Sequence, residues 1–224
     1  MFEARAMVDR LLVHRVLRSR TPELAAESAL RGARASAAIE GADVALDQAR
    51  FGPAGDPVLA GALRAYGELP RLRSVWRSSP RQALARLHLL AAADLAGPDR
   101  LGRPADVVGA AALGRIGSLA LSTTTAPALL VAAVVHGELA TAAGFDHGNG
   151  VVARAAARLV LADRGLDPGL LCTPEVGHLE LGDYVQTLAS YGGGDAGPWL
   201  LHCAHAALAG AREALAVAEA MVRG

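Results

Sequence analysis

The sequence contains no lysine, a single asparagine and few aromatic residues. Its 22 basic residues are therefore all arginines, and 22 acidic residues balance them to a formal net charge of zero. Because a nucleic-acid-binding surface needs an excess of positive charge, this balance argues against a nucleic-acid partner.

Cysteines and long apolar runs are also scarce. Cys172 and Cys203 are the only cysteines, and they lie far apart without a metal-ligand spacing, which favours reduced core residues in a reducing compartment. The longest apolar run, residues 126–135, is too short to cross a bilayer. The N-terminus mixes acidic residues with arginines, unlike a signal or transit peptide. We therefore expect a cytoplasmic protein without a membrane partner.

Strand-forming residues are few as well. Hydrophobic residues make up 52% of the chain, much of it alanine, and aromatic residues only 4%. Alanine has the highest helix propensity, and runs of Val, Ile and Thr are short. The composition predicts an all-α fold, and 224 residues can bury one sizeable core. We expect a single domain over residues 1–224.

Helix start and stop signals divide the chain into periodic segments. Thr21-Pro22-Glu23 reads as an N-cap followed by proline at the first helical position. Turn compositions at 51–53, 97–100, 165–168 and 191–194 separate further segments. The predicted helices are 4–18, 22–41, 57–69, 80–96, 104–120, 125–142, 149–165, 174–190 and 196–222, with a core over 57–190.

A bend between two helical segments is the main candidate site. The helix at 125–142 is apolar on nearly all sides, which predicts a central, buried position. It is followed by Phe145-Asp146-His147-Gly148-Asn149-Gly150, in which Asn149 is the only asparagine. Glycine and asparagine tolerate a positive φ, so the backbone can turn sharply there and direct N–H groups into one concavity.

The next helix adds an anion-binding feature to this bend. Its unpaired first-turn N–H groups and positive dipole end favour phosphate. Arg154 lies about one turn further along, and its guanidinium could bind phosphate oxygens in a bidentate manner. The spacing leaves open that Gly148, Asn149 and Gly150 form only a turn and that Arg154 is a surface charge.

The segment resembles the central motif of the Fic family, H-x-F-x-[DE]-G-N-G-R-x-x-R, at Phe145, Gly148, Asn149, Gly150 and Arg154. Residues 86–88 and 181–184 resemble flanking helices of that family, and the similarity spans roughly residues 30–205. The resemblance implies a Fic-like helical bundle that binds nucleotide phosphates, usually those of ATP, through Gly148, Asn149, Gly150 and Arg154.

Three positions depart from the motif. The general-base histidine is replaced by Ala143, which cannot transfer a proton. The acidic residue that would hold Mg²⁺ is His147, a poor ligand for a hard cation, although the neighbouring Asp146 could partly substitute. The first motif arginine is Val151. AMP transfer is therefore in doubt, Mg²⁺ is an uncertain cofactor, and the sequence predicts no other metal site.

Another histidine would have to replace the missing base. His147 lies inside the bend, and histidine is the residue type best suited to acid–base chemistry at neutral pH, so it is the first candidate, with Asp146 second. His136 lies two helical turns before Ala143, about 10 Å along the axis, which is too remote. The remaining five histidines are scattered in sequence, and we interpret them as structural or exposed: His14, His88, His178, His202 and His205.

An inhibitory contact is also predicted. Glu40 ends a helix, where the dipole disfavours a carboxylate, so a cationic partner from elsewhere in the fold is expected. Residues 36–41 match the pattern [ST]-x-x-x-E-[GN] of the Fic inhibitory helix, in which the glutamate pairs with the last motif arginine. The resemblance implies an ion pair between Glu40 and Arg154, with Ser36 in the same cleft.

The sequence leaves three functions open. The chain binds a nucleotide or another phosphorylated small ligand without efficient AMP transfer, or it is a Fic-type transferase that modifies a protein hydroxyl with an unconventional base, or it is a helical interaction module. A protein target and a homodimer also stay open.

Overall fold

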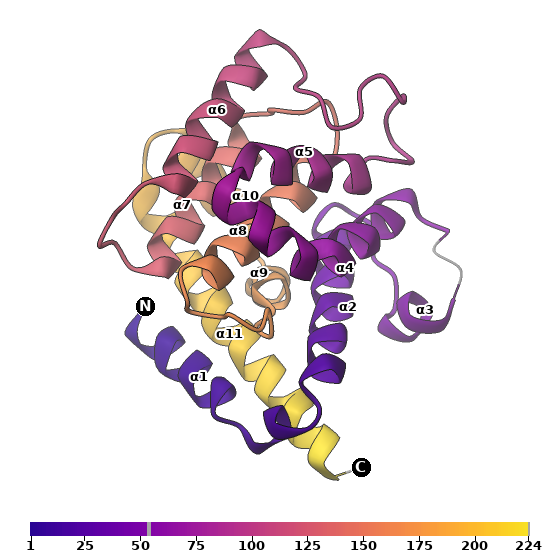
Figure 1. The fold of residues 1–224 in the computed structure, drawn as a ribbon, viewed down its shortest axis with the longest axis vertical. Coiled ribbons are helices and arrows are strands. Elements are labelled where there is room, and N and C mark those ends of the chain that lie inside the picture. Colours follow the sequence, from indigo (N-terminus) through magenta and orange to yellow (C-terminus); the bar gives the residue numbers. More distant parts are fainter. Residues whose placement is uncertain (53–54, 224) are drawn as a thin grey trace.

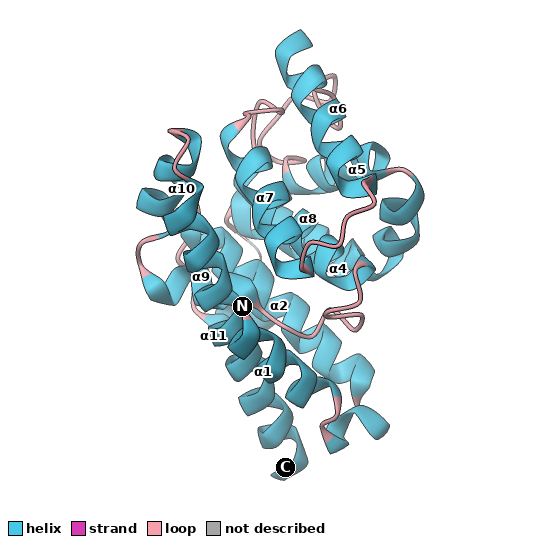
Figure 2. Cartoon of the chain, turned by 90° about the vertical axis from the view of Figure 1, so that its left-hand side faces the viewer, coloured by secondary structure: helices cyan, strands magenta, loops and turns pink. Residues whose placement is uncertain are grey.

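The computed structural model describes residues 1–52 and 55–223. These residues form eleven α-helices and one 3-10 helix and contain no strand (Figures 1 and 2), which confirms the all-α prediction. Pro53, part of a predicted break, and Gly224, the last residue of the predicted domain, lie outside the described residues. The helices are α1 (Phe2–Leu12), η1 (Arg15–Arg18), α2 (Thr21–Ile39), α3 (Leu46–Phe51), α4 (Pro57–Ser78), α5 (Pro80–Ala91), α6 (Val107–Leu121), α7 (Ala128–Thr141), α8 (Asn149–Asp163), α9 (Pro174–Leu181), α10 (Tyr184–Gly192) and α11 (Ala196–Arg223).

The centre of the fold is α8. It packs against α2, α4, α5 and α7, and eleven of its fifteen residues are buried. The sequence predicted this central position for the preceding helix, α7, in which eight of fourteen residues are buried. The two helices pack together, and a larger share of α8 is buried. Whatever α8 carries at its N-terminus is therefore held rigidly.

The chain ends are packed on the core. The long helix α11 runs beside α1, so the two terminal helices lie side by side (Figures 1 and 2). A small hydrophobic cluster that includes Leu11, Leu24 and Leu215 joins them to α2. Further along, α11 packs against α9 and α10. Among the described residues, no helix combines the length and apolarity needed to cross a membrane.

Two predicted helices are each split in the structure. The helix expected at 4–18 ends at Leu12, because His14 is extended and its Nδ1 accepts a hydrogen bond from Val16 N at 3.3 Å. The helix expected at 174–190 divides at Gly182, which has φ 74° and ends α9. In both places a side-chain or glycine stop signal overrides a continuous apolar pattern.

Other boundaries were wrong for local reasons. Helix α4 continues through Pro70 to Ser78, whereas the sequence reading ended it at residue 69. The short helix α3 was missed. Thr21 is the first residue of α2 and not its N-cap, since its hydroxyl donates to Leu17 O at 2.7 Å. Both cysteines are buried and free, as predicted.

Candidate functional site

The bend between α7 and α8 adopts the sharp turn that its composition predicts. Gly148 caps α8 in the left-handed region with φ 70°, and Ala143 earlier in the loop has φ 44°. Gly148 also lies close to the end of α5, because a Cβ placed on it would be 3.6 Å from Ala91 Cβ. The positive φ thus falls on Gly148 and Ala143, and α8 begins at Asn149 in helical conformation.

Asn149 holds the bend closed. Its side-chain oxygen accepts from Phe145 N at 3.0 Å, and its side-chain nitrogen donates to Phe145 O at 2.7 Å. Both ends of the amide are therefore used within the loop. Any contact of Asn149 with an anion would come from its backbone N–H, which belongs to the unpaired first turn of α8.

The ring of Phe145 packs against the ring of His88, which comes from α5. The two rings stack with centroids 4.1 Å apart, and His88 Nδ1 accepts from Gly102 N at 2.9 Å. Burial lowers the pKa of His88. The Leu-His segment identified in the sequence thus serves to position the bend.

Arg154 is the charged centre of the site. Its side chain is 1% exposed, and its guanidinium donates to Ser36 Oγ at 2.9 Å, Ser36 O at 3.0 Å, Tyr184 Oη at 3.0 Å and Glu40 Oε1 at 2.7 Å. Burial alone would lower the pKa of Arg154, but the interactions with Tyr184 and Glu40 raise it, so the group stays cationic. The sequence alternative of a surface charge is thereby wrong.

The predicted ion pair between Glu40 and Arg154 is present, with Ser36 beside it. Glu40 is the C-cap of α2, and its carboxylate also lies against Gly150, where any added Cβ would collide with it. The carboxylate therefore lies at the N-terminus of α8, where the positive dipole end stabilises it. The Glu40 side chain is 34% exposed, so the anion that pairs with Arg154 is accessible to solvent.

The residues that depart from the motif lie around this pair. Val151 is 2% exposed and packs into the hydrophobic core, so this position offers no ligand atom to an anion. Ala143 and His147 are exposed in the loop. His147 is thus accessible, but no polar contact in the described structure orients it toward Arg154.

Asp146 is paired away from the ion pair. Arg100 donates to it in a bidentate manner at 2.5 and 2.8 Å, and this contact lowers the pKa of Asp146. A carboxylate with a lowered pKa is a weaker base. The same pairing speaks against Mg²⁺, because the cation would have to displace Arg100 and the motif position next to it is an imidazole. The residues present do not fit a resident Mg²⁺.

Two histidines that the sequence left scattered, His178 and His202, lie beside Arg154 together with His136, which the sequence placed too far from Ala143 to replace the base. His136 Nε2 lies 2.8 Å from Tyr184 Oη, His178 Nδ1 lies 2.8 Å from His202 Nε2, and His202 Nδ1 lies 2.6 Å from Asp183. Burial lowers the pKa of all three imidazoles, most strongly those of His136 and His178. No spacing rule reveals this cluster, because three different helices and the loop before α10 supply it.

A second buried arginine was also missed. Arg158, one turn after Arg154, donates to Ser28 Oγ at 2.8 Å and to Leu170 O. Its guanidinium stands over the ring of Tyr66, 5.8 Å from the centroid. An arginine in a helix that is otherwise apolar was the available signal, since such a charge is buried only with partners.

The backbone is similar to those of solved Fic proteins. A Fic family protein from Desulfovibrio desulfuricans G20 matches with a TM-score of 0.77 and 20% identity, over 96% of this chain and 73% of that chain. This chain has the Fic fold. Fic-1 from C. elegans matches with a TM-score of 0.77 and 18% identity, over 97% of this chain and 71% of the solved fragment. No protein-family model and no curated protein matches the sequence.

Proposed function

We propose that this Fic-fold chain binds the phosphates of a nucleotide such as ATP at the N-terminus of α8, in competition with Glu40, and transfers AMP poorly or not at all. The observation that carries the proposal is the Glu40 carboxylate itself. It occupies the place between Gly150 and Arg154 and is 34% exposed, whereas Arg154 is 1% exposed. A buried cation whose anionic partner can leave is suited to exchanging one anion for another.

The chemical part of the proposal rests on the groups near the bend. Residue 143 is alanine, and Asp146 is held by Arg100 with a lowered pKa. Neither can accept a proton from a target hydroxyl efficiently. His147 is the remaining candidate base in this loop, so a transferase that uses His147 is the alternative that the experiment must separate.

Binding is tested by calorimetry with ATP, and with pyrophosphate as the minimal phosphate probe. In Glu40→Gly the competing carboxylate is gone, and ATP affinity should rise about tenfold, which is about 1.4 kcal/mol. Glu180→Gly is the matched control, since it removes an exposed acid from the end of α9. It should leave ATP affinity unchanged.

Two results would overturn phosphate binding: no heat of binding for ATP or pyrophosphate with Glu40→Gly, or equal affinity for folded Arg154→Met and the parent. Transfer is measured separately, with labelled ATP and mixed protein substrates. Turnover by the parent chain that disappears in His147→Ala would replace the poor-transfer proposal with an active transferase.

A gain-of-function variant tests the role of position 143. Ala143 is exposed and has φ 44°, a conformation that histidine adopts more readily than most residues with a side chain. Ala143→His combined with Glu40→Gly should show more labelling than Glu40→Gly alone. Equal labelling of the two would contradict the assignment of the missing base to residue 143.

A further inference from the structure

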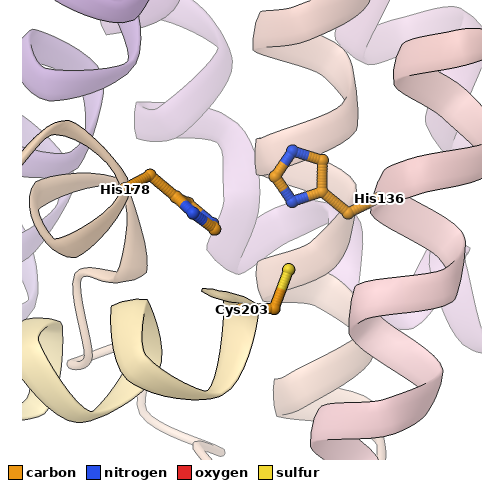
Figure 3. A group of neighbouring side chains, drawn as sticks. All are labelled: His136, His178 and Cys203. Atoms are coloured by element: carbon orange, nitrogen blue, oxygen red, sulfur yellow. The ribbon is translucent and has the colours of Figure 1, made fainter. Parts of the chain in front are cut away.

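Three side chains with metal-ligating atoms face one another in the interior, apart from the anion site. His136 comes from α7, His178 from α9 and Cys203 from α11, and all three are buried. Each contributes one ligand atom, and these atoms all lie within 4.8 Å of one another. Figure 3 shows the two imidazoles and the thiol directed toward a common space.

The hydrogen-bond network leaves a lone pair free on His178. The carboxylate of Asp183 can only accept, so the His202 nitrogen 2.6 Å away, Nδ1, carries the proton. His202 Nε2 then accepts from His178 Nδ1–H at 2.8 Å. The remaining nitrogen of His178, Nε2, is unprotonated and available as a ligand.

The other two groups are also available. His136 Nε2 is engaged with Tyr184 Oη, which leaves Nδ1 as the free nitrogen, and Figure 3 shows this nitrogen on the side of Cys203. Within the described part of the chain, the Cys203 thiol makes no hydrogen bond. The other cysteine, Cys172, donates to Ala207 O at 3.5 Å. The thiol facing the imidazoles is thus the one without a partner.

The spacing fits a single ion after a small contraction. The three ligand atoms are at most 4.8 Å apart, and at that spacing a point equidistant from them lies about 2.8 Å from each. Bonds from a metal ion such as zinc to imidazole nitrogen and thiolate sulfur are about 2.0 to 2.3 Å long. Each ligand would move inward by less than about 1 Å. We propose that His136, His178 and Cys203 bind one thiophilic transition-metal ion, Cu(I) in preference to Zn(II).

Charge and ligand number decide the preference. Thiolate and imidazole are ligands that soft or borderline ions favour. Cu(I) with one thiolate and two neutral imidazoles has no net charge, whereas Zn(II) would leave one positive charge near the buried guanidinium of Arg154. Among the described residues the cluster supplies three ligands, and Zn(II) normally takes four.

Binding of the metal ion releases a proton and leaves the oxidation state of the ion unchanged. The thiol of Cys203 releases its proton to solvent and its sulfur donates an electron pair to the ion. His136 binds as the tautomer protonated at Nε2, where the N–H donates a hydrogen bond to Tyr184 Oη, and the lone pair of Nδ1 binds the ion. One proton is released for each ion bound. The His178, His202 and Asp183 chain has the form of an outer shell that orients a ligating imidazole.

The test titrates the whole chain with Cu(I) under argon, in competition with a chromogenic Cu(I) chelator, and with Zn(II) in parallel. We expect one Cu(I) per chain, one proton released and a thiolate-to-metal absorption band. Cys203→Ala should lose affinity at least 100-fold. Cys172→Ala removes the other buried cysteine and should bind as the parent does.

A variant at the edge of the cluster tests the network without disturbing the core. The Asp183 side chain is 50% exposed, so Asp183→Asn should fold, and the lost carboxylate should weaken Cu(I) binding about 10- to 100-fold. Equal binding by the parent and Cys203→Ala, or no 1:1 binding by the parent, would overturn the site. Tighter binding of Zn(II) than of Cu(I) would overturn the stated preference. No nucleotide is present, so these results are independent of the proposed function.

Discussion

Arg154 and Arg158 lie one turn apart on the same face of α8, and both are almost completely buried, at 1% and 2% exposure. Both reach across to α2, where their partners are Ser36 and Ser28, two turns apart. Their remaining partners differ. Arg158 donates to the backbone carbonyl of Leu170, while Arg154 pairs with the carboxylate of Glu40, whose side chain is 34% exposed.

This difference separates the arginine that we propose binds phosphate from a structural one. Burial of the arginine does not distinguish them. The neighbours of Arg158 are enclosed, and burial raises the pKa of both Asp167 and Glu175 against the opposing effect of its charge. Arg154 has one partner that can turn into solvent. The exposure of the anion, and not of the cation, distinguishes the site at which we propose anion exchange.

Replacing each arginine with methionine should give the largest difference in the free energy of unfolding between the two positions. Arg158→Met should lower the free energy of unfolding by about 3 to 5 kcal/mol, because buried Asp167 and Glu175 lose their compensating charge. Arg154→Met should lower it by about 1 to 3 kcal/mol, since Glu40 can be hydrated. Urea unfolding followed by circular dichroism measures both. A larger loss for Arg154→Met would contradict the comparison.

Acidification should lower the free energy of unfolding through the buried histidines beside Arg154. The folded pKa values of His136 and His178 lie well below 6.5, so only the unfolded chain takes up protons as the pH falls below 6.5. Stability is then lost by about 1.4 kcal/mol per pH unit for each histidine until their folded pKa values are reached. The raised pKa values of Asp167 and Glu175 act in the opposite direction. Their contribution to the free energy of unfolding falls as the pH rises above the pKa values that these groups have in the unfolded chain.

Urea midpoints between pH 7.5 and 5.5 test this pH dependence. The midpoint should fall toward pH 5.5, and His178→Gln, which removes one of the histidines with a lowered pKa, should show a shallower slope. A midpoint that is constant over this range would show that the cluster takes up protons in the folded state as well.

The smallest contrast compares two glycines that pack against the two arginines. A Cβ at Gly32 would lie 2.9 Å from Arg158 Nη1 and 3.0 Å from both Glu175 Oε2 and Tyr66 Cε1, all in enclosed side chains. Gly32→Ala should therefore cost about 1 to 2 kcal/mol. At Gly150 the main obstacle is the Glu40 carboxylate, which can swing outward, while Arg154 Nη1 would lie 3.2 Å from the Cβ, so Gly150→Ala should cost less than Gly32→Ala, below about 1 kcal/mol.

Thermal unfolding of the two glycine variants measures this difference. Equal destabilisation would mean that Glu40 is held as firmly as the groups around Arg158, and the exchangeable character of its carboxylate would be lost.

Much of the fold was predictable because its signals are local. Alanine content predicted the helices, and Gly148 marked the turn into α8. Errors arose where one side chain changed a boundary, as at His14, or where tertiary packing carried a helix through Pro70. The motif also pointed to Glu40, Ser36 and Arg154, whose contact the structure confirms.

Residue chemistry along the chain was sufficient for the helix content, the bend before Asn149 and the neutral overall charge, because propensity, turn preference and charge act over a few residues. Packing between distant segments determined which of two arginines faces an exposed acid, and it brought His136, His178 and Cys203 together from three helices. Those contacts depend on how helix faces are oriented by the whole core, and no local spacing encodes that orientation.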